Sequence, residues 1–242
     1  MSFHSSQDLS FVIGAFLGDG SFVEDSAYHH HVKLAVRDRE FAEAFNLCVG
    51  RVLNRQENKI TVTHDLGKVY YESKYSSQPL GFYLKSGLEN LRPVVETYPR
   101  SFLRGLFSAD GCASISTHNG LTLRILLGNS NPDLLHCAES ILQSRFDIHS
   151  KTHLARKKGA TWAFGKKTVI LRKDAYLLRI ERVNDVRVFV SEIGFVMRRK
   201  QEVAERAIQL LKALGRSKAA DVWKRYYSTK KGARWSYLAP IE

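Results

Sequence analysis

Two stretches of the sequence, FVIGAFLGDGS at residues 11–21 and FLRGLFSADGC at residues 102–112, nearly repeat each other. Each stretch is largely apolar and has small residues four positions apart. In each, an Asp-Gly pair stands just before the last residue. Residues four apart lie on one face of a helix, so each stretch predicts a helix with a smooth face that a second helix can approach closely. The small residues are Gly14 and Gly18 in the first stretch and Gly105 and Ala109 in the second.

If the two helices pack side by side and in parallel, Asp19 and Asp110 emerge next to each other at the helix ends. Helix C-termini carry partial negative charge and close carboxylates repel each other, so the arrangement favours a bound cation. Oxygen ligands suit a hard divalent ion, and Mg²⁺ is the expected cofactor, with Mn²⁺ or Ca²⁺ as substitutes for binding. We expect Gly20 and Gly111 to let the chain leave each helix in a conformation that other residues resist.

The same order of elements follows both stretches. Val32, Leu34 and Val36 occupy alternate positions, which is the period of a half-buried strand. The sequence pattern of each half predicts a helix, two strands, a helix, two strands and a helix. Asn119-Gly120 favours a tight hairpin turn. After the motif helices, the expected strands are 21–24, 29–37, 58–65, 68–76, 112–117, 121–129, 151–157 and 175–182, and the expected helices are 38–53, 79–91, 131–146 and 183–194.

Both stretches resemble the paired motifs of the LAGLIDADG homing endonucleases, whose single-chain members carry two motifs in tandem. The metal-binding acid of the family, at the eighth motif position, corresponds to Asp19 in VIGAFLGDG and to Asp110 in LRGLFSADG. The sixth position, acidic in the family's name, is Leu17 and Ser108 here. Because that position packs or caps rather than binding metal, the departure leaves the assignment in place.

The resemblance implies an α+β fold of two pseudo-symmetric αββαββα units, whose curved antiparallel sheets form a DNA-binding saddle joined by the packed motif helices. It implies a monomeric, Mg²⁺-dependent endonuclease that hydrolyses both strands of a long, asymmetric double-stranded DNA target and leaves short 3′ overhangs. The carbonyls of Gly18 and Ala109 are expected to complete the metal site. Residues expected to hold the surrounding water network are Arg37, Asn129 and, at the start of the last helix, Lys200.

Strand alternation predicts which side chains face DNA. Those opposite the apolar set can bond base edges and phosphates, although a sheet surface that faces water uses the same residue types. Neighbours on a strand point to opposite faces, so His29, His30 and His31 are not expected to bind one metal ion together. The expected contacts are Ser21, His29, His31, Lys33, Arg37, Lys59, Thr61, Thr63, Lys68, Tyr70, Glu72 and Lys74 in the first half, and Ser114, Ser116, Arg124, Lys151, His153, Lys157, Lys158, Lys166, Lys167, Arg179 and Glu181 in the second.

Charge divides the chain unevenly. Residues 1–96 hold 10 basic and 12 acidic side chains, whereas residues 97–242 hold 27 and 12, giving a net charge of +13 overall. Residues 151–173 hold eight basic side chains and no acid. Seven more lie in 216–235, interleaved with Trp and Tyr. Such dense clusters predict a nucleic-acid partner. We expect an N-terminal half at 1–96, a C-terminal half at 97–214 and a basic, aromatic extension at 215–242.

Other functions on the same scaffold remain open. A maturase that binds intron RNA would keep the fold and the basic surface, and a catalytically silent transcription regulator would need an appended helix-turn-helix, for which residues 197–242 give no convincing pattern. Retention of both aspartates favours DNA cleavage. An intein is disfavoured by Met1 and the final APIE. No stretch predicts a membrane helix or a signal peptide, so we expect a cytoplasmic, nucleoid-associated or organellar protein.

Overall fold

The N-terminal half forms one four-stranded sheet with helices packed against it. The computed structural model describes residues 3–26, 29–65, 67–164, 167–230 and 234–237. The elements of this half are α1 (Gln7–Asp19), β1 (Gly20–Ser26), β2 (His29–Val36), α2 (Arg39–Val52), β3 (Thr61–Asp65), β4 (Lys68–Ser76), α3 (Gln78–Lys85) and α4 (Leu88–Thr97).

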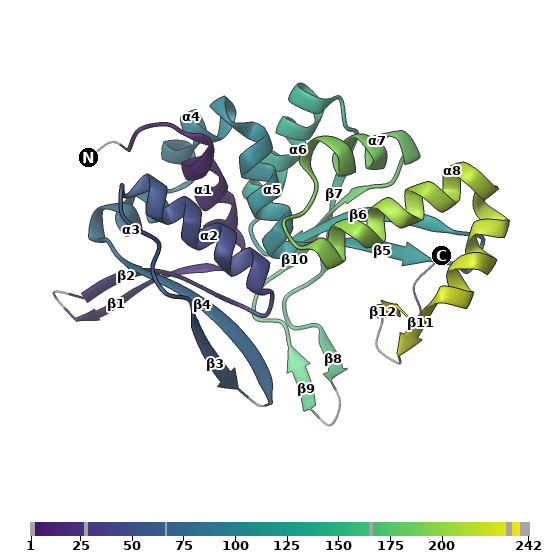
Figure 1. The fold of residues 1–242 in the computed structure, drawn as a ribbon, viewed down its shortest axis with the longest axis horizontal. Coiled ribbons are helices and arrows are strands. Elements are labelled where there is room, and N and C mark those ends of the chain that lie inside the picture. The colour runs from purple at the N-terminus through teal and green to yellow at the C-terminus, as the bar shows by residue number, and fades with distance from the viewer. Residues whose placement is uncertain (1–2, 27–28, 66, 165–166, 231–233, 238–242) are drawn as a thin grey trace.

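The C-terminal half repeats this order beside the first (Figure 1). Its long basic insertion forms an additional hairpin, β8–β9, between the last two strands of the sheet. The elements are α5 (Pro99–Asp110), β5 (Gly111–Ser116), β6 (Thr122–Asn129), α6 (Pro132–Phe146), β7 (Lys151–Arg156), β8 (Thr161–Phe164), β9 (Lys167–Ile170), β10 (Ala175–Ile180), α7 (Val183–Val188) and the π-helical turn η1 (Phe189–Ile193).

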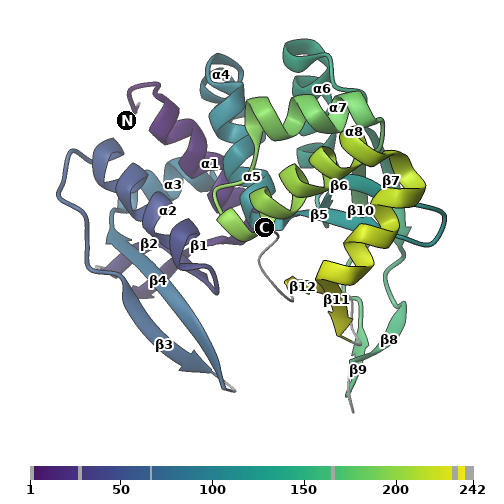
Figure 2. The same ribbon diagram turned by 45° about the vertical axis from the view of Figure 1, so that its right-hand side comes forward.

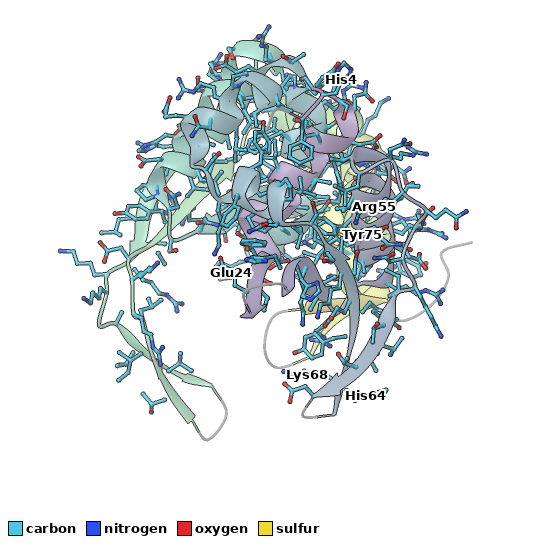
Figure 3. The ribbon with its side chains drawn as sticks, turned by 90° about the vertical axis from the view of Figure 1, so that its left-hand side faces the viewer. His4, Glu24, Arg55, His64, Lys68 and Tyr75 are labelled. Carbon is cyan, nitrogen blue, oxygen red and sulfur yellow. The ribbon has the colours of Figure 1, made fainter. Side chains whose placement is uncertain are left out.

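The two main sheets have equivalent strand orders, β1-β2-β4-β3 and β5-β6-β10-β7, with antiparallel pairing throughout. Helices cover one side of the sheets, and the hairpins β3–β4 and β8–β9 project from the other side as the two legs of an arch (Figure 3). The predicted α+β fold of two similar units is therefore confirmed.

Strand alternation sets which side of each sheet is buried. In β2, Val32, Leu34 and Val36 are buried, whereas Ala35 between them is exposed. In β6 the buried residues are Leu123, Ile125 and Leu127, again at every second position. Since successive side chains of a strand point to opposite faces, the other face of each sheet is left toward the arch.

Two local expectations were wrong. The helix expected over 79–91 is broken, because α3 ends at Lys85 and Gly87 adopts a φ of +94°, a backbone conformation that side chains disfavour. The tight Asn119-Gly120 turn is instead a loop of residues 117–121 in which Gly120, but not Asn119, has positive φ. A two-residue type I′ turn requires positive φ at both positions.

A final helix and hairpin follow the C-terminal half. The helix α8 (Arg198–Tyr226) runs beside β5 and β6 and bends sharply at Gly215, whose φ is +70° (Figure 2). The strands β11 (Tyr227–Lys230) and β12 (Arg234–Tyr237) then pair as a short hairpin. Within the described residues, no helix has the length and apolarity needed to cross a bilayer.

Candidate active site

The helices α1 and α5 touch backbone to backbone at their glycines. A Cβ atom built on Gly14 would lie 2.1 Å from the carbonyl oxygen of Phe102, and one built on Gly105 would lie 2.4 Å from the carbonyl oxygen of Phe11. Contacts this short leave no space for any side chain. The close approach predicted from the small residues is therefore present, and it fixes where the two helices end.

The ends of these helices bring the two aspartates together. A Cβ atom at Gly18 would lie 2.4 Å from the Cβ of Ala109 and 3.4 Å from Oδ2 of Asp110. Asp19 follows Gly18 directly and is the last residue of α1, as Asp110 is of α5. Two carboxylates at two negative helix termini therefore share one small region.

Gly20 and Gly111 are needed for a different reason from the one expected. Their φ values are −79° and −91°, which any residue adopts. A Cβ atom at Gly20 would lie 2.5 Å from Cα of Phe16, and one at Gly111 would lie 2.5 Å from the carbonyl oxygen of Phe107. The glycines let each chain turn from helix to strand against its own last helical turn.

Asp110 is held by a hydrogen-bonded amide. Nδ2 of Asn129, the last residue of β6, donates to Oδ2 of Asp110 over 2.6 Å. Oδ1 of the same amide accepts from the backbone N–H of Asn131 over 2.8 Å, which fixes its orientation. Burial raises the pKa of Asp110 to about 6, and the charge of Asp19 adds to the rise against the opposing effects of Asn129 and Lys200.

Asp19 is more exposed and has a different neighbour. Desolvation by the protein around it raises its pKa, the positive charge of Lys200 lowers it, and Asp38 raises it. Asp38 in turn forms a bidentate ion pair with Arg199 of α8, with Nε–Oδ1 and Nη2–Oδ2 distances of 2.6 and 2.7 Å. This pair joins the N-terminal half to α8 beside the aspartates.

Lys200 is fixed by two backbone oxygens at the junction of α5 and β5. Its Nζ donates to the carbonyl oxygens of Ser108 and Gly111 over 2.8 and 2.7 Å. Burial lowers its pKa to about 8, and the nearby guanidinium of Arg199 adds to the decrease. The side chain therefore places a cation directly behind the end of α5.

A groove of about 1730 Å³ opens beside this cluster. Its lining comes from both halves and from α8, so it crosses the centre of the molecule. Arg37, one residue beyond β2, lines it and is exposed. Other residues that line the groove include Asp19, Tyr70, Ser108, Ala109, Ser114, Ser116, Lys200, Lys224 and Tyr227.

The donor set fits a divalent cation held only partly by side chains. Two carboxylates with raised pKa lie at helix C-termini, where a cation would relieve their repulsion. In the described part of the chain, no group of three or more His, Cys, Asp or Glu could hold a metal. The remaining ligands would therefore be backbone carbonyls, water or phosphate oxygens, which Mg²⁺ commonly uses.

The strand register places the predicted residues of the first half on one face of its sheet. Ser21 lies opposite Lys33 and Lys33 opposite Lys74, while Thr63 lies opposite Tyr70. Lys33 and Glu72 form an ion pair of 2.6 Å on this face. The others are His31, Thr61 and Lys68 on the strands and exposed Lys59 just before β3; His29 lies in β2, outside the described side chains.

The second half gives a similar face. Ser114 lies opposite Arg124, and Arg179 lies opposite Lys151. Nε of Arg124 approaches Oε1 of Glu181 at 3.1 Å. Ser116 and His153 have the same strand parity, and Lys157 and Lys158 are exposed in the turn before β8. Lys167 lies in β9, and Lys166 lies outside the described residues.

Alternation does not imply burial in the legs of the arch. All five residues of β3 are exposed, including Val62 at 51 %. The hairpin projects beyond the helices, and His64 and Lys68 lie near its tip (Figure 3).

The spacing of residues along the sequence also does not predict the Asp38–Arg199 ion pair, because its members are 161 positions apart.

A family model of LAGLIDADG-like domains matches residues 6–87 and 97–194. The chain therefore belongs to the LAGLIDADG-like family. Among curated proteins, an uncharacterised protein of Methanocaldococcus jannaschii is 27 % identical over 206 residues, covering 84 % of this chain and 72 % of that protein.

Solved structures with a similar fold include homing endonucleases. Mesophilic variants of I-DmoI match with a TM-score of 0.57 and 19 % identity, over 84 % of this chain and 99 % of theirs. I-DmoI in complex with DNA and Mn matches with a TM-score of 0.55 and 20 % identity, over 79 % and 98 %. Full-length DUF199/WhiA from Thermatoga maritima matches with a TM-score of 0.50 and 17 % identity, over 92 % and 67 %.

Proposed function

We propose that this protein is a site-specific DNA endonuclease that makes a double-strand break in a long, asymmetric target, using Mg²⁺ bound between Asp19 and Asp110. The observation that carries the proposal is the meeting of two carboxylates at touching helix ends, between two sheet faces that can each contact half of a duplex. The fold shared with I-DmoI, which has been crystallised with DNA and Mn, supports the same activity.

The protein's own groups have distinct roles in this proposal. Asp19 and Asp110 would hold the cation, with the carbonyls of Gly18 and Ala109 as further candidate ligands. When bound, a divalent ion lowers the pKa of water and stabilises charge on phosphate oxygens. Asn129 orients the carboxylate of Asp110 through its 2.6 Å hydrogen bond.

The cationic residues of the site complement phosphate. Lys200 supports the end of α5 through Ser108 and Gly111, and its positive charge lies near both carboxylates. Arg37 lines the groove at the end of the other half's second strand, where it can neutralise a phosphate. The two groups thus flank the aspartates from different halves.

Selection of the target and its cleavage can be combined in one test. Duplexes bound by the protein are selected from a random library in Ca²⁺, and the enriched sequences are then incubated with Mg²⁺. We expect double-strand cutting at one position, lost in Asp19→Asn and Asp110→Asn. Asp133→Asn, at an exposed position in the first turn of α6, is the matched control and should cut normally. Sequence-specific binding without cutting would contradict the proposal and favour a silent regulator.

An RNA-binding maturase is the second candidate, favoured by the concentration of positive charge in residues 97–242. Tighter binding to structured RNA than to every selected duplex, with no cutting of either strand, would support it over the endonuclease.

A further inference from the structure

The C-terminal appendage, defined as residues 216–226 of α8 and the hairpin β11–β12, lies outside the part of the chain that matches the family. The family model ends at residue 194. The match to I-DmoI uses 99 % of that protein but only 84 % of this chain. The contacts of the appendage itself, rather than the family match, therefore indicate its role.

The appendage is anchored at its start by the loop between β5 and β6. The backbone N–H of Leu121 donates to the carbonyl oxygen of Arg216 over 2.8 Å, and Nη2 of Arg216 donates to the carbonyl oxygen of Asn119 over 3.2 Å. A Cβ atom on Gly120 would lie 3.1 Å from Cβ of Arg216. These contacts hold the chain where it bends at Gly215.

An apolar stripe packs the part of α8 that follows Gly215 against the rest of the protein. Ala219, Trp223 and Tyr227 recur every four residues and are buried, with no exposed surface on Trp223. The rings of Trp223 and Tyr227 stack at a centroid distance of 4.0 Å. The segment is therefore packed against the protein, and its charged residues lie outside the stripe.

The charged residues of this segment are mostly basic. Residues 216–226 hold four Arg or Lys and the single acid Asp221. Lys218, Lys224 and Arg225 are exposed. Lys224 also lines the groove that contains Asp19 and Arg37, so its charge faces the same space as the candidate active site.

The appendage lies on the arch side of the C-terminal sheet. In Figure 1 the hairpin β11–β12 lies below β5, on the side from which β8–β9 projects. In Figure 3 the yellow ribbon of the appendage lies across the arch from the green β8–β9 leg. A duplex in the arch would therefore pass between β8–β9 and the appendage.

We propose that the C-terminal appendage is a clamp for the DNA backbone, in which Lys224 and its basic neighbours contact phosphates on the side of the duplex opposite β8–β9. The choice of duplex DNA as the ligand rests on the proposed function, but the clamp does not require that the DNA be cleaved. A segment that blocked the arch would be expected to carry acidic side chains, whose negative charge would replace that of phosphate on the basic surface. The appendage carries mostly basic side chains instead.

The salt dependence of binding tests the clamp. Affinity for a fluorescent duplex of arbitrary sequence is measured across a salt series in Ca²⁺, for the full chain, for Lys224→Gln and for the triple variant Lys218→Gln/Lys224→Gln/Arg225→Gln. Removing one phosphate contact should reduce the slope of log affinity against log salt by about 0.9. We expect the slope to fall by the equivalent of about one phosphate contact in the single variant and about two or three contacts in the triple variant.

Lys212→Gln is the matched control, because Lys212 is exposed on α8 before the bend at Gly215 and so lies outside the appendage. Its slope should equal that of the unmodified chain. A triple variant with the same slope as this control would overturn the clamp, and a variant that bound duplex more tightly would identify the appendage as a blocking segment.

Failure of the clamp and failure of the proposed function can be told apart. If the unmodified chain binds duplex but cuts none, the endonuclease proposal fails, while the comparison of slopes still decides the clamp. Circular dichroism and thermal unfolding check that the variants fold; the substitutions are at exposed positions outside the buried stripe, so we expect unchanged unfolding temperatures.

Discussion

The N-terminal and C-terminal halves share one topology but hold their aspartates in different surroundings. Asp110 is partly buried, receives a hydrogen bond from Asn129 and has a pKa of about 6. Asp19 is exposed to the groove, and its acidic neighbour Asp38 is paired with Arg199. The symmetric backbone thus determines where the carboxylates lie, whereas the residues around each determine how strongly it would bind a cation or a proton.

The legs of the arch differ as well. In the first half the leg is an extension of β3 and β4, which belong to the main sheet. In the second half it is a separate hairpin, β8–β9, inserted in the most basic part of the chain. This difference indicates that the second half carries more of the electrostatic attraction for a polyanion.

The largest expected effect compares the two aspartates. Asp19→Asn and Asp110→Asn should each reduce double-strand cutting by about a thousandfold or more, because the loss of metal stabilisation costs several kcal/mol. Cutting of the selected duplex in Mg²⁺ measures this, with duplex binding in Ca²⁺ as the control for folding. If one variant cut both strands at the normal rate, the two halves would not share a site.

The helix contact should be equally sensitive from both sides. Gly14→Ala and Gly105→Ala should each lower the free energy of unfolding by about 3 kcal/mol or more, since the new methyl group meets backbone atoms that cannot move aside. Urea unfolding measures the decrease. Gly128→Ala is the control, because its Cβ would meet its nearest atom at 3.7 Å. A stable Gly105→Ala protein would contradict the packing.

The pH dependence of stability should distinguish the aspartates. The folded-state pKa of Asp110 is raised to about 6, so the folded protein binds this proton more tightly than the unfolded chain does. The stability that protonated Asp110 contributes to the folded state is therefore lost as pH rises from about 4 through 6. At pH 8 in EDTA, Asp110→Asn should therefore be more stable than the unmodified chain by on the order of 2 kcal/mol.

Asp19→Asn should give a smaller gain, because Asp19 is exposed. Thermal unfolding at pH 5 and pH 8 measures both variants. Adding Mg²⁺ at pH 8 should stabilise the unmodified chain and leave Asp110→Asn almost unchanged, because a ligand that binds only the folded state raises stability. An equal Mg²⁺ response in that variant would place the cation elsewhere.

The smallest expected effects compare residues that are proposed to face DNA. Lys157→Gln/Lys158→Gln should weaken binding to all duplexes alike and lower the salt slope by about 0.9 for each true contact. Lys33→Ala should instead change base preference, because it leaves Glu72 without its 2.6 Å partner on the sheet face. Titration of a selected and a scrambled duplex measures both. The same uniform weakening in both variants would remove the proposed division of roles.

Several parts of the site could be predicted because they depend on local sequence. Gly14 and Gly105 mark the helix contact, and alternation in β2 identifies the buried face. In both cases the spacing along the chain translates directly into geometry. Asn129 was expected instead from the resemblance to the family, as the residue at the end of the second strand of its half, and it donates a hydrogen bond to Asp110.

Other parts depend on contacts that spacing does not encode. The Asp38–Arg199 pair joins residues 161 positions apart, and no local pattern marks either member. Gly20 and Gly111 could be recognised as necessary, but the reason is a close approach to the preceding helical turn rather than a positive φ. Val62 alternates like a core residue and is exposed, because the packing of the leg is set by what surrounds it.

The backbone contact between α1 and α5 has a consequence for exchange of the halves. Gly14 and Gly105 each meet main-chain atoms of the opposite helix, so at these two positions the contact places few demands on the side chains of the other half. The Asp38–Arg199 pair adds one specific demand. The sheet faces, which lie away from this contact, are then free to accumulate substitutions separately. A half taken from a relative with glycine at the equivalents of Gly14 or Gly105 should therefore assemble with the remaining half of this chain, and such grafts would produce hybrid proteins with recombined surfaces.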